Sequence, residues 1–529
     1  MSRTIKLFSA IFLLVIIENA SSQNTFQKTY GGNINFFSGK PGLSTSDGGY
    51  ILLGGSSSAL SACSLIKTDV HGDTLWTRSY KIGRGTEGNS VVPTFDDGYL
   101  ITGKYNDQWN VDHLCLIKTN YEGNLVWMKA LSYDDFSVGV FVEQTLDHGY
   151  VILESRPDLN SRYFICLIKI DNDGNVLWSK NYSNGWDVGG SAVHQTNDGG
   201  FIISGNYYPN EFNYGGYLIK TNSYGDTLWT RVYGGTNNGF SSVQQTSDGG
   251  YITVGSIFTS GSDSGDVFLV KTKSNGYPLW LKTYGGTGRE QGKCVQQTLD
   301  GGYIIVGETT SINPGSRDIY IIKTDVNGDT LWTKTYGGTG MNDGNSILQT
   351  SDGGYIIAGS MSGGNAGVGG PCFIKTDSLG SSGCNESSSI TITGIPVTPI
   401  WVSLTYVGAG FNPFDAPTAI VSNGGIVNTI CSHIGINEIT RQENIISVFP
   451  NPAKNDFTIK INNSKKNSEI VIYNMFGKEV MSSKFSGNRV EITNANLENG
   501  IYLLKLLNED KYYVEKLIIQ KDQQDVYKK

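Results

Sequence analysis

Two kinds of apolar run alternate along most of the chain at a regular spacing. The run DGGYIIAGS at 352–360 has six close variants, which begin at residues 47, 96, 147, 198, 248 and 300. After a longer loop, each leads to a second run, such as DIYIIKTD at 318–325. Both runs are apolar at nearly every position, which predicts strands that are buried on both faces.

Each pair of runs is flanked by two further strands. In one copy, CVQQT (294–298) precedes the first run and TLWTKTYGG (330–338) follows the second. Asp-Gly and Asn-Gly pairs mark the turns, because these residues tolerate the positive φ of tight hairpins. Six tryptophans mark the fourth strand at a regular spacing: Trp76, Trp127, Trp178, Trp229, Trp280 and Trp332. Four short strands repeated in this way predict a β-propeller, whose blades pack between copies of themselves.

The two ends of the repeat complement each other. The last copy, at 349–380, has no tryptophan strand after it, whereas TFQKTYGG at 25–32 precedes the first copy. We therefore expect the N-terminal strand to pair near residue 375 and complete the last blade, which would leave no free sheet edge. The predicted fold is all-β, with a closed seven-bladed β-propeller over residues 23–384.

Composition narrows the class of protein. The 68 glycines in 529 residues fit an all-β chain with many turns, and the length exceeds that of a single core. A formal net charge of -8 argues against a nucleic-acid partner, which needs a basic surface.

The N-terminus has the pattern of a secretory signal peptide, predicted over residues 1–22. Arg3 and Lys6 precede an apolar core at 7–17, and small residues follow. That core is too short to span a bilayer stably, and we expect no transmembrane segment elsewhere. The mature protein is expected to be exported, soluble and monomeric.

The seven cysteines do not form a disulfide framework by position. Cys115, Cys166 and Cys372 fill a strand position that holds Tyr or Phe in other copies, so they are expected to be small buried hydrophobic residues. Cys384 and Cys431 lie outside such positions, and a disulfide between them is predicted.

The repeat resembles that of bacterial secreted propellers, with the pattern DGGYIIxGxT…IKTDxxGDTLWTKTYGG over residues 25 to 384. The TDxNGDxxW hairpin is also similar to the tryptophan-docking motif of quinoprotein propellers. This resemblance implies that the six tryptophans wedge between neighbouring blades. No quinone-binding set of residues accompanies it, and no cofactor is expected.

The chain changes character after the repeat. Residues 385–442 are rich in Val, Thr, Pro and Gly and are interpreted as an extended spacer or small β segment without an assigned function. Residues 443–521 contain alternating strands and turns that predict a small β-sandwich, followed by a polar tail at 522–529.

This last part resembles the type A C-terminal sorting domain of the type IX secretion system of Bacteroidota. The matching residues are Pro450, Asn451, Pro452, Gly477, Gly500, Tyr502 and Lys516. The resemblance implies the type IX secretion machinery as a partner, and passage through the periplasm and across the outer membrane. The cargo would then be released or held at the cell surface.

No catalytic residue or metal ligand is predicted. The recurring aspartates (Asp97, Asp147, Asp198, Asp248, Asp300 and Asp352) stand in hairpin turns, where Asp caps its own backbone. The five histidines are scattered, and no HExxH spacing is present.

The loop after the second strand differs in every copy and carries aromatic residues. The predicted ligand face, for a glycan or a protein, consists of Tyr105, Trp109, Tyr207, Tyr208, Phe212 and Tyr214, with Trp186 in a neighbouring link. Three alternatives remain at this point: these aromatics pack on one another, the protein is a structural surface-layer component, or it is a secreted glycan hydrolase or lyase with a site at the channel mouth.

Overall fold

A computed structural model of the protein consists of strands and turns, with no α-helix in the described residues. It divides into two compact units, Met1–Gly435 and Ile436–Lys529, which are treated separately below. The structure describes residues 24–521 apart from 32–33, 36–41, 57–61, 132–136, 158–162, 184–186, 211–212, 234–237, 259–264, 313–315, 339, 363–369, 384–385, 388–391, 394–404, 407–412, 416–419, 423–425, 434–445, 452, 455, 462–467, 475–478, 494–496, 498 and 509–510.

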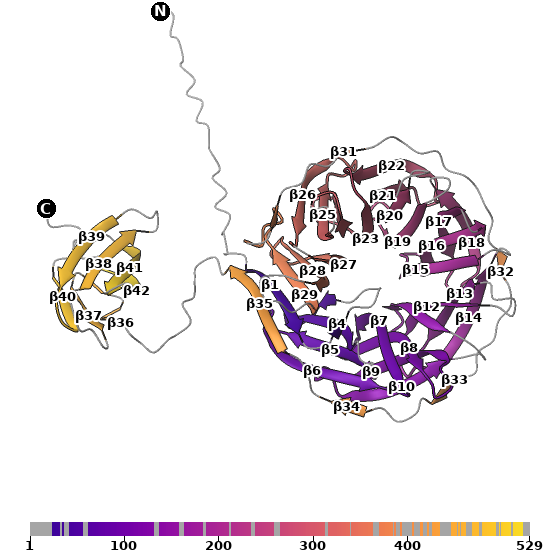
Figure 1. Ribbon diagram of the computed structural model, residues 1–529, viewed down its shortest axis with the longest axis horizontal. Coiled ribbons are helices and arrows are strands. Elements are labelled where there is room, and N and C mark those ends of the chain that lie inside the picture. Colours follow the sequence, from indigo (N-terminus) through magenta and orange to yellow (C-terminus); the bar gives the residue numbers. More distant parts are fainter. Residues whose placement is uncertain are drawn as a thin grey trace, which may run out of the picture. The chain divides into compact units, whose positions relative to one another are not determined.

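The described strands of the first unit form seven sheets arranged around a common centre (Figure 1). From the inside outward, sheet 1 holds β2 (Ile34–Asn35) and β3 (Gly42–Ser44), then β4 (Tyr50–Ser56), β5 (Cys63–Thr68) and β6 (Thr74–Lys81); sheet 2 holds β7 (Gly85–Pro93), β8 (Tyr99–Asn106), β9 (Asp112–Thr119) and β10 (Leu125–Leu131); and sheet 3 holds β11 (Val138–Gln144), β12 (Tyr150–Pro157), β13 (Tyr163–Ile170) and β14 (Val176–Ser183).

The remaining sheets follow the same order. Sheet 4 holds β15 (Asp187–Gln195), β16 (Phe201–Asn210), β17 (Asn213–Thr221) and β18 (Thr227–Tyr233); sheet 5 holds β19 (Asn238–Gln245), β20 (Tyr251–Phe258), β21 (Gly265–Thr272) and β22 (Pro278–Gly285); sheet 6 holds β23 (Glu290–Gln297), β24 (Tyr303–Thr309), β25 (Asp318–Thr324) and β26 (Thr330–Tyr336); and sheet 7 holds β27 (Asn342–Gln349), β28 (Tyr355–Met361), β29 (Gly370–Thr376) and β1 (Thr25–Gly31).

The middle strands are buried on both faces, as the apolar runs predict. Every residue of β24 and β25 is buried, and the two strands pair antiparallel from Tyr303 opposite Thr324 to Thr309 opposite Asp318. The outer strand β26 alternates instead between buried and accessible positions. The apolar core therefore lies between neighbouring sheets.

The first strand of the chain completes the last sheet. β1 pairs antiparallel with β29, with Phe26 opposite Lys375 and Thr29 opposite Cys372. The predicted pairing of residues 25–32 near position 375 is thereby confirmed.

The inner strands share an irregularity that the sequence pattern did not reveal. In sheets 2 to 7, a β-bulge interrupts the pairing of the first two strands at the same place, for example between Gly292 and Cys294 opposite β24. The strand opposite usually has Gly there, because a Cβ on Gly307 would lie 1.8 Å from the carbonyl oxygen of Gln291. Sheet 3 departs from this rule, with Glu154 opposite Gly139.

The spacer predicted for 385–442 is, where it is described, a series of short strands on the outer edges of the sheets (Figure 1). We call residues 386–433 the outer strap. Its strands are β30 (Glu386–Ser387) on β26, β31 (Ile392–Thr393) on β22, β32 (Thr405–Tyr406) on β14, β33 (Pro413–Asp415) on β10, β34 (Ile420–Ser422) on β6 and β35 (Ile426–His433) on β1. The strap thus passes sheets 6, 5, 3, 2, 1 and 7 in turn, and its backbone pairs with edge groups that would otherwise face water.

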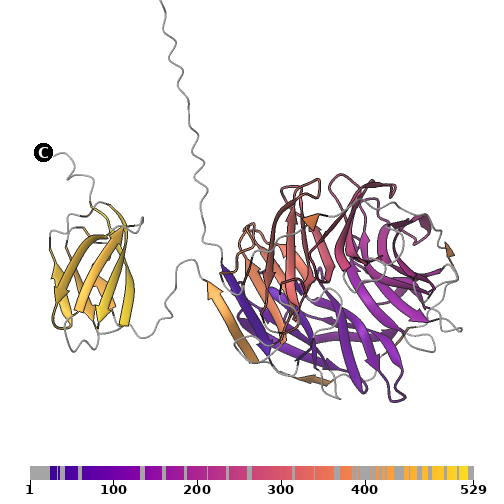
Figure 2. The same ribbon diagram turned by 45° about the horizontal axis from the view of Figure 1, so that its top comes forward.

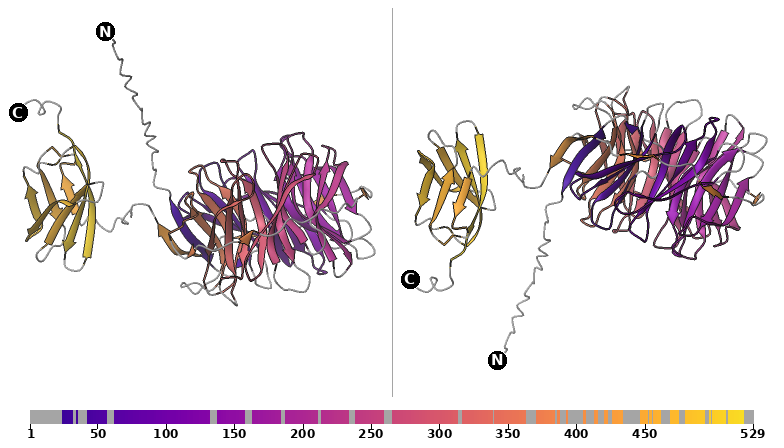
Figure 3. Two further views of the ribbon diagram at one scale, coloured as in Figure 1. Left: turned by 90° about the horizontal axis from the view of Figure 1, so that it is seen from above. Right: turned by 90° about the horizontal axis from the view of Figure 1, so that it is seen from below.

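The turns and loops that join the strands gather on two opposite faces of the first unit (Figure 3). One face carries the tight hairpins between the first two and the last two strands of each sheet, and we call it the hairpin face. The other carries the variable loops between the second and third strands, and we call it the loop face.

The second unit is a small β-sandwich (Figure 2). One sheet has the order β36 (Ile446–Phe449), β37 (Phe457–Ile461) and β40 (Arg489–Ile492); the other has β39 (Glu479–Phe485), β38 (Ser468–Asn474), β41 (Gly500–Asn508) and β42 (Lys511–Ile519). Ile459, Ile472, Leu504 and Leu517 are fully buried between the sheets.

Within the described part of the chain, no helix is long and apolar enough to cross a membrane. The predicted signal peptide at 1–22 lies outside the described residues.

Candidate functional site

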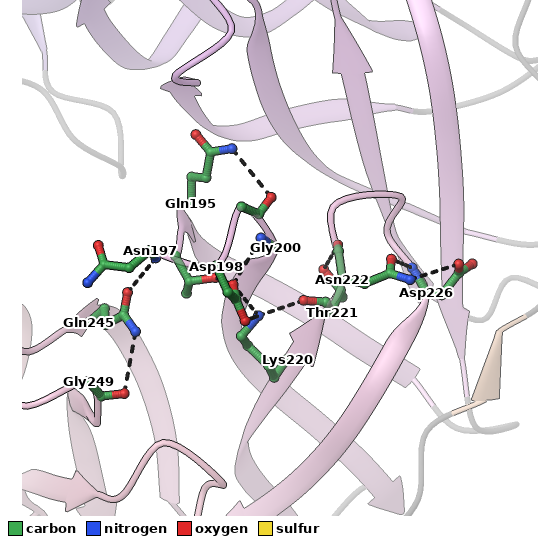
Figure 4. A network of polar contacts seen from close by, with 12 residues as sticks. Gln195, Asn197, Asp198, Gly200, Lys220, Thr221, Asn222, Asp226, Gln245 and Gly249 are labelled. Carbon is green, nitrogen blue, oxygen red and sulfur yellow. Dashed lines mark hydrogen bonds and ion pairs between the residues drawn. The ribbon is translucent and has the colours of Figure 1, made fainter.

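The recurring aspartate of each DGGY hairpin stabilises the turn. In sheet 4, the Asp198 carboxylate accepts hydrogen bonds from Thr196 Oγ1 at 2.6 Å, from the Gly200 N–H at 3.0 Å and from Lys220 Nζ at 3.0 Å (Figure 4). The Lys220 ammonium is almost fully buried and also donates to the carbonyl oxygen of Thr221 at 2.7 Å. These contacts hold the turn together and pair the buried lysine with a carboxylate.

The same ion pair occurs in all seven sheets, at N···O distances of 2.7–3.0 Å: Lys67–Asp47, Lys118–Asp96, Lys169–Asp147, Lys220–Asp198, Lys271–Asp248, Lys323–Asp300 and Lys375–Asp352. In sheet 2, the equivalent residue is Asp96 and not Asp97, which instead occupies the turn position with a φ of 59°. Burial alone would raise the pKa of Asp248, but hydrogen bonds from Lys271, Thr246 and Gly250 lower it to about 2.

The tryptophans and a set of tyrosines contact the next sheet around the ring. The ring of Trp229 lies 5.8 Å from that of Tyr251 in an edge-on arrangement, and a Cβ on Gly276 would lie 2.8 Å from the indole. Tyr233 Oη donates to the carbonyl oxygen of the same glycine at 2.7 Å. Equivalent rings are 5.9–6.1 Å apart in the pairs Trp76–Tyr99, Trp178–Phe201, Trp280–Tyr303 and Trp332–Tyr355, and Gly174 crowds Trp127 in the same way.

Trp109, from the predicted ligand face, is the most exposed aromatic side chain that the structure describes, at 77 %. It stands at the tip of the turn between β8 and β9. Asp107 Oδ1 accepts the backbone N–H groups of Trp109 at 2.8 Å and of Val111 at 2.9 Å, and its other oxygen lies 3.2 Å from His113 Nε2. The Val111 N–H contributes most to lowering the pKa of Asp107. The indole is therefore presented to solvent by a turn whose backbone is fixed.

Two exposed tyrosines lie near each other in sheets 3 and 4. Tyr208 is 43 % exposed and pairs with Asp187 across β15 and β16. The N–H of Tyr163, a residue 51 % exposed at the start of β13, donates to Asp187 Oδ1 at 2.8 Å. Asp187 thus brings both tyrosines to the loop face. The sequence analysis did not single out Tyr163, although it ends one of the variable loops.

The prediction that Tyr105 is part of the exposed face is wrong. Its side chain is 4 % exposed and packs with Ile82, Cys115 and Ala130, with its ring 5.1 Å from that of His113. β8 extends through Asn106, so Tyr105 is still an inward-facing strand residue.

The other residues of the predicted face are placed only in part. Tyr207 is half-buried against Gly215, and only the backbone of Tyr214 is described, in β17. Trp186 and Phe212 lie outside the described residues.

Of the five thiols that the structure describes, four are buried and Cys294 is partly accessible. Cys63, Cys115, Cys166 and Cys372 are buried and reduced, and burial raises the pKa of Cys115 to about 12. The backbone of Cys431 pairs opposite Gln27, whereas Cys384 lies outside the described residues. A disulfide between Cys384 and Cys431 stays a prediction.

The sorting-domain residues cluster near the end of β42. Asn451 Oδ1 accepts the N–H of Ile518 at 2.8 Å, and Ala453 exchanges backbone hydrogen bonds with Ile518 and Gln520 at 2.8 and 2.7 Å. Gly500 starts β41 and Tyr502 is buried beside the core. Pro450 is exposed; Lys516 is placed by its backbone in β42, and Pro452 and Gly477 lie outside the described residues.

No group of three or more His, Cys, Asp or Glu side chains in the described residues is arranged to hold a metal ion. Some carboxylates at the loop face are engaged by the protein itself. Glu290, for example, accepts hydrogen bonds from Thr309 Oγ1 at 2.6 Å and from the Gly286 N–H at 3.0 Å.

Comparison with known proteins identifies the second unit. Residues 447–520 match the family described as secretion system C-terminal sorting domain, which confirms the prediction for this part of the chain. No curated protein is significantly similar to the chain as a whole.

Two solved structures match the chain at low similarity. Sqt1 from Chaetomium thermophilum is 10 % identical, with a TM-score of 0.39 over 63 % of this chain and 82 % of that one. A neuraminidase-like protein of A/flat-faced bat/Peru is 12 % identical, with a TM-score of 0.34 over 68 % of this chain and 99 % of that one.

The sorting domain matched by residues 447–520 indicates secretion to the cell surface or the extracellular space.

Proposed function

We propose that the protein is cargo of the type IX secretion system whose first unit is a closed seven-bladed β-propeller. In this proposal, the propeller is a non-catalytic scaffold that binds a glycan or a protein through its loop face. The observation that carries the proposal is Trp109, which is 77 % exposed on a turn fixed by Asp107.

Closure of the ring is supported by the contacts between sheets 7 and 1. Tyr30 Oη of β1 donates to the carbonyl oxygen of Gly72 at 2.8 Å, the same bond that Tyr233 makes to Gly276 within the ring. Phe26 takes the position of the missing tryptophan, with its ring 6.2 Å from that of Tyr50. This junction therefore has the chemistry of the other junctions.

A binding role is supported by the solvent exposure of the loop-face aromatics. An exposed indole costs solubility without stabilising the fold, unless a ligand covers it. Aromatic faces stack on the apolar faces of sugar rings and also anchor protein interfaces, because they bury a large area at little entropic cost. Trp109, Tyr163 and Tyr208 supply three such faces from sheets 2, 3 and 4.

The test uses the secreted full chain on a glycan array and in pull-downs from the surface of neighbouring cells. We expect binding that falls at least tenfold in Trp109→Ala and Tyr208→Ala. Tyr121→Ala is the matched control, because Tyr121 is 61 % exposed in a turn at the hairpin face. Binding that is unchanged in Trp109→Ala and Tyr208→Ala, or equally reduced in Tyr121→Ala, would contradict the proposal.

One observation favours a second function, that of a secreted glycan hydrolase or lyase. His194 Nδ1 contacts the Glu143 carboxylate on the inner strands, and such a contact would orient a neutral imidazole as a general base. If this function is correct, glycans that bind the protein will be cleaved, and His194→Gln will abolish cleavage without loss of binding.

A further inference from the structure

The inner strands line a partly open cavity of about 260 Å³. β11, β15, β19, β23 and β27 all contribute to its wall. The polar side chains that line it include those of Ser191, His194, Ser241, Lys293, Gln296 and Asn345. It is distinct from the loop-face aromatics described above, since none of them lines it.

The shared β-bulge explains why these side chains converge. The extra residue of a bulge has no partner across the ladder, so its side chain can be aimed away from the sheet. The extra residues in sheets 2 to 7 are Asn89, Val140, Ser191, Ser241, Lys293 and Asn345, and the last four of them line the cavity.

A second layer of side chains lies three residues after the bulge. Some of these side chains form hydrogen bonds with the next inner strand. Gln244 Oε1 accepts the N–H of Gln297 at 2.8 Å, and Gln296 Oε1 accepts that of Gln349 at 2.7 Å. Sheets 3 and 4 have Glu143 and His194 at these positions. Glu143 accepts the Gln195 N–H at 3.3 Å through one oxygen, and its other oxygen contacts His194 Nδ1.

Among the described residues, the cavity is lined by basic side chains and by no acidic ones. Its ionisable side chains are those of Lys293 and His194, with Cys294, and no carboxylate is among the lining residues. An ammonium has three N–H donors, and Gln291 Oε1 accepts one from Lys293 at 3.0 Å. Glu308 also attracts Lys293 but is ion-paired with Arg317 at 3.3 Å. The cavity therefore favours an anion.

Size and polarity narrow the class of ligand. The volume is below the roughly 300–1,000 Å³ of sites for drug-sized molecules, which suits a single six-membered ring. Hydroxyl and carboxamide groups surround it, while Phe141 and Leu348 supply apolar contacts. A sugar ring presents hydroxyl groups at its edge and C–H groups on its faces.

We propose that this cavity is a binding site for a monosaccharide-sized sugar acid, whose carboxylate lies at Lys293 and whose hydroxyl groups lie among Ser191, Ser241 and Asn345. The site is independent of the loop-face ligand, so either proposal can fail without the other.

The test is isothermal titration of the full chain with glucuronate and, separately, with glucose. We expect glucuronate to bind at least tenfold more tightly than glucose, and more weakly at higher salt. Lys293→Gln should reduce the affinity for glucuronate at least tenfold, whereas Lys273→Gln, which removes an exposed lysine from a hairpin-face turn, should leave it unchanged. Trp109→Ala should also leave it unchanged.

Ser241→Leu provides a second route, because it fills the cavity without changing its charge. Each variant is first compared with the parent by circular dichroism and thermal unfolding, and Asn345→Leu replaces any variant that does not fold. The proposal is wrong if glucuronate produces no heat at concentrations on the order of 10 mM, if glucose binds as tightly, or if the cavity variants bind like the parent.

Discussion

The two faces of the first unit are built on opposite principles. At the hairpin face, the same contacts recur: the Lys–Asp pair is present in all seven sheets, and the hydroxyl of a tyrosine such as Tyr233 reaches the next sheet at six junctions. At the loop face, the side-chain contacts differ from one sheet to the next. Lys104 lies between Glu87 and Asp112 in sheet 2, whereas Glu290 is held by hydroxyl groups in sheet 6.

The difference separates the contacts that pack the sheets from the groups that the proposed function assigns to binding. A contact that every sheet needs in order to pack on the next must be repeated, because all the junctions have nearly the same geometry. A group that contacts a ligand need occur only once. Trp229 and Trp109 illustrate the two cases, since one packs against a neighbouring sheet and the other faces solvent.

The largest expected effect is the difference in stability loss between a Trp→Ala substitution at the hairpin face and one at the loop face. Trp229→Ala leaves a cavity beside Tyr251 and Gly276, and we expect it to lower the free energy of unfolding by about 3 kcal/mol. Trp109→Ala should change it by no more than about 0.5 kcal/mol, since the side chain is exposed. Urea unfolding followed by fluorescence measures both, and equal losses would remove the distinction between the faces.

Sheet 3 departs from the repeat at Glu154, because the equivalent position in the other sheets with the β-bulge holds Gly. The pH dependence of stability tests the effect of this difference. Burial raises the pKa of Glu154 to about 7, against the opposing charge of Arg156. In the unfolded chain, this carboxyl ionises near pH 4, so the folded state binds the extra proton between about pH 4 and 7. Stability should therefore fall by roughly 3 kcal/mol as the pH rises through this interval.

Glu154→Gly, which introduces the residue found at this position in the other sheets, should remove that fall. Ser155→Gly is the neighbouring control and should keep it. Thermal unfolding of the parent and both variants from pH 4 to 8 provides the measurement. A parent curve that coincides with that of Glu154→Gly would refute the assignment.

A smaller effect is expected at the opposite end of the pH scale. The pKa of Asp248 is lowered to about 2, so its contribution to stability is present above pH 4 and is lost as the pH falls from about 4 to 2. Because more than half of its side chain is exposed, screening reduces this contribution to about 1 kcal/mol. Asp248→Asn should shift the acid unfolding midpoint upward, whereas Asp97→Asn, which leaves a Lys–Asp pair intact, should not.

The smallest expected effect is an increase in the free energy of unfolding. Asp97 has a φ of 59°, at a turn position where most of the hairpins have Gly, such as Gly199 with a φ of 80°. Asp97→Gly should raise the free energy of unfolding by about 0.5 kcal/mol, because it relieves left-handed strain. Gly199→Asp, the reverse change at the equivalent position of sheet 4, should lower it in the same urea titration. A loss in Asp97→Gly would show that the Asp side chain stabilises this turn.

The repeated part of the fold could be predicted because each strand carries its own signal. The apolar runs, the turn residues and the tryptophans all have the same period, and the incomplete first and last copies pointed to the pairing of β1 with β29. The outer strap had no such signal. Most of its strands are two or three residues long, too short for any periodicity, and they pair with edges whose position depends on the finished ring.

The candidate site was less predictable, for reasons visible at single residues. Tyr105 and Trp109 lie in the same variable segment, but β8 continues through Asn106, so one is buried and the other is exposed. Asp96 and Asp97 are adjacent and chemically identical, and only the register of the turn decides which one meets Lys118. The cavity depends on a bulge that leaves no mark in the apolar pattern.

The pairing of β1 on both of its edges has a consequence for how the chain matures. Phe26 lies opposite Lys375 on one side and Ser432 on the other, so the first strand made has to wait for some of the last. Closing a loop of this length costs about 5 kcal/mol of chain entropy, which the contacts of the completed last sheet must offset. A chain that leaves the ribosome N-terminus first therefore remains incomplete until its final propeller residues are made. The sorting domain follows these residues in the chain, so it is made after the segments that complete the last sheet.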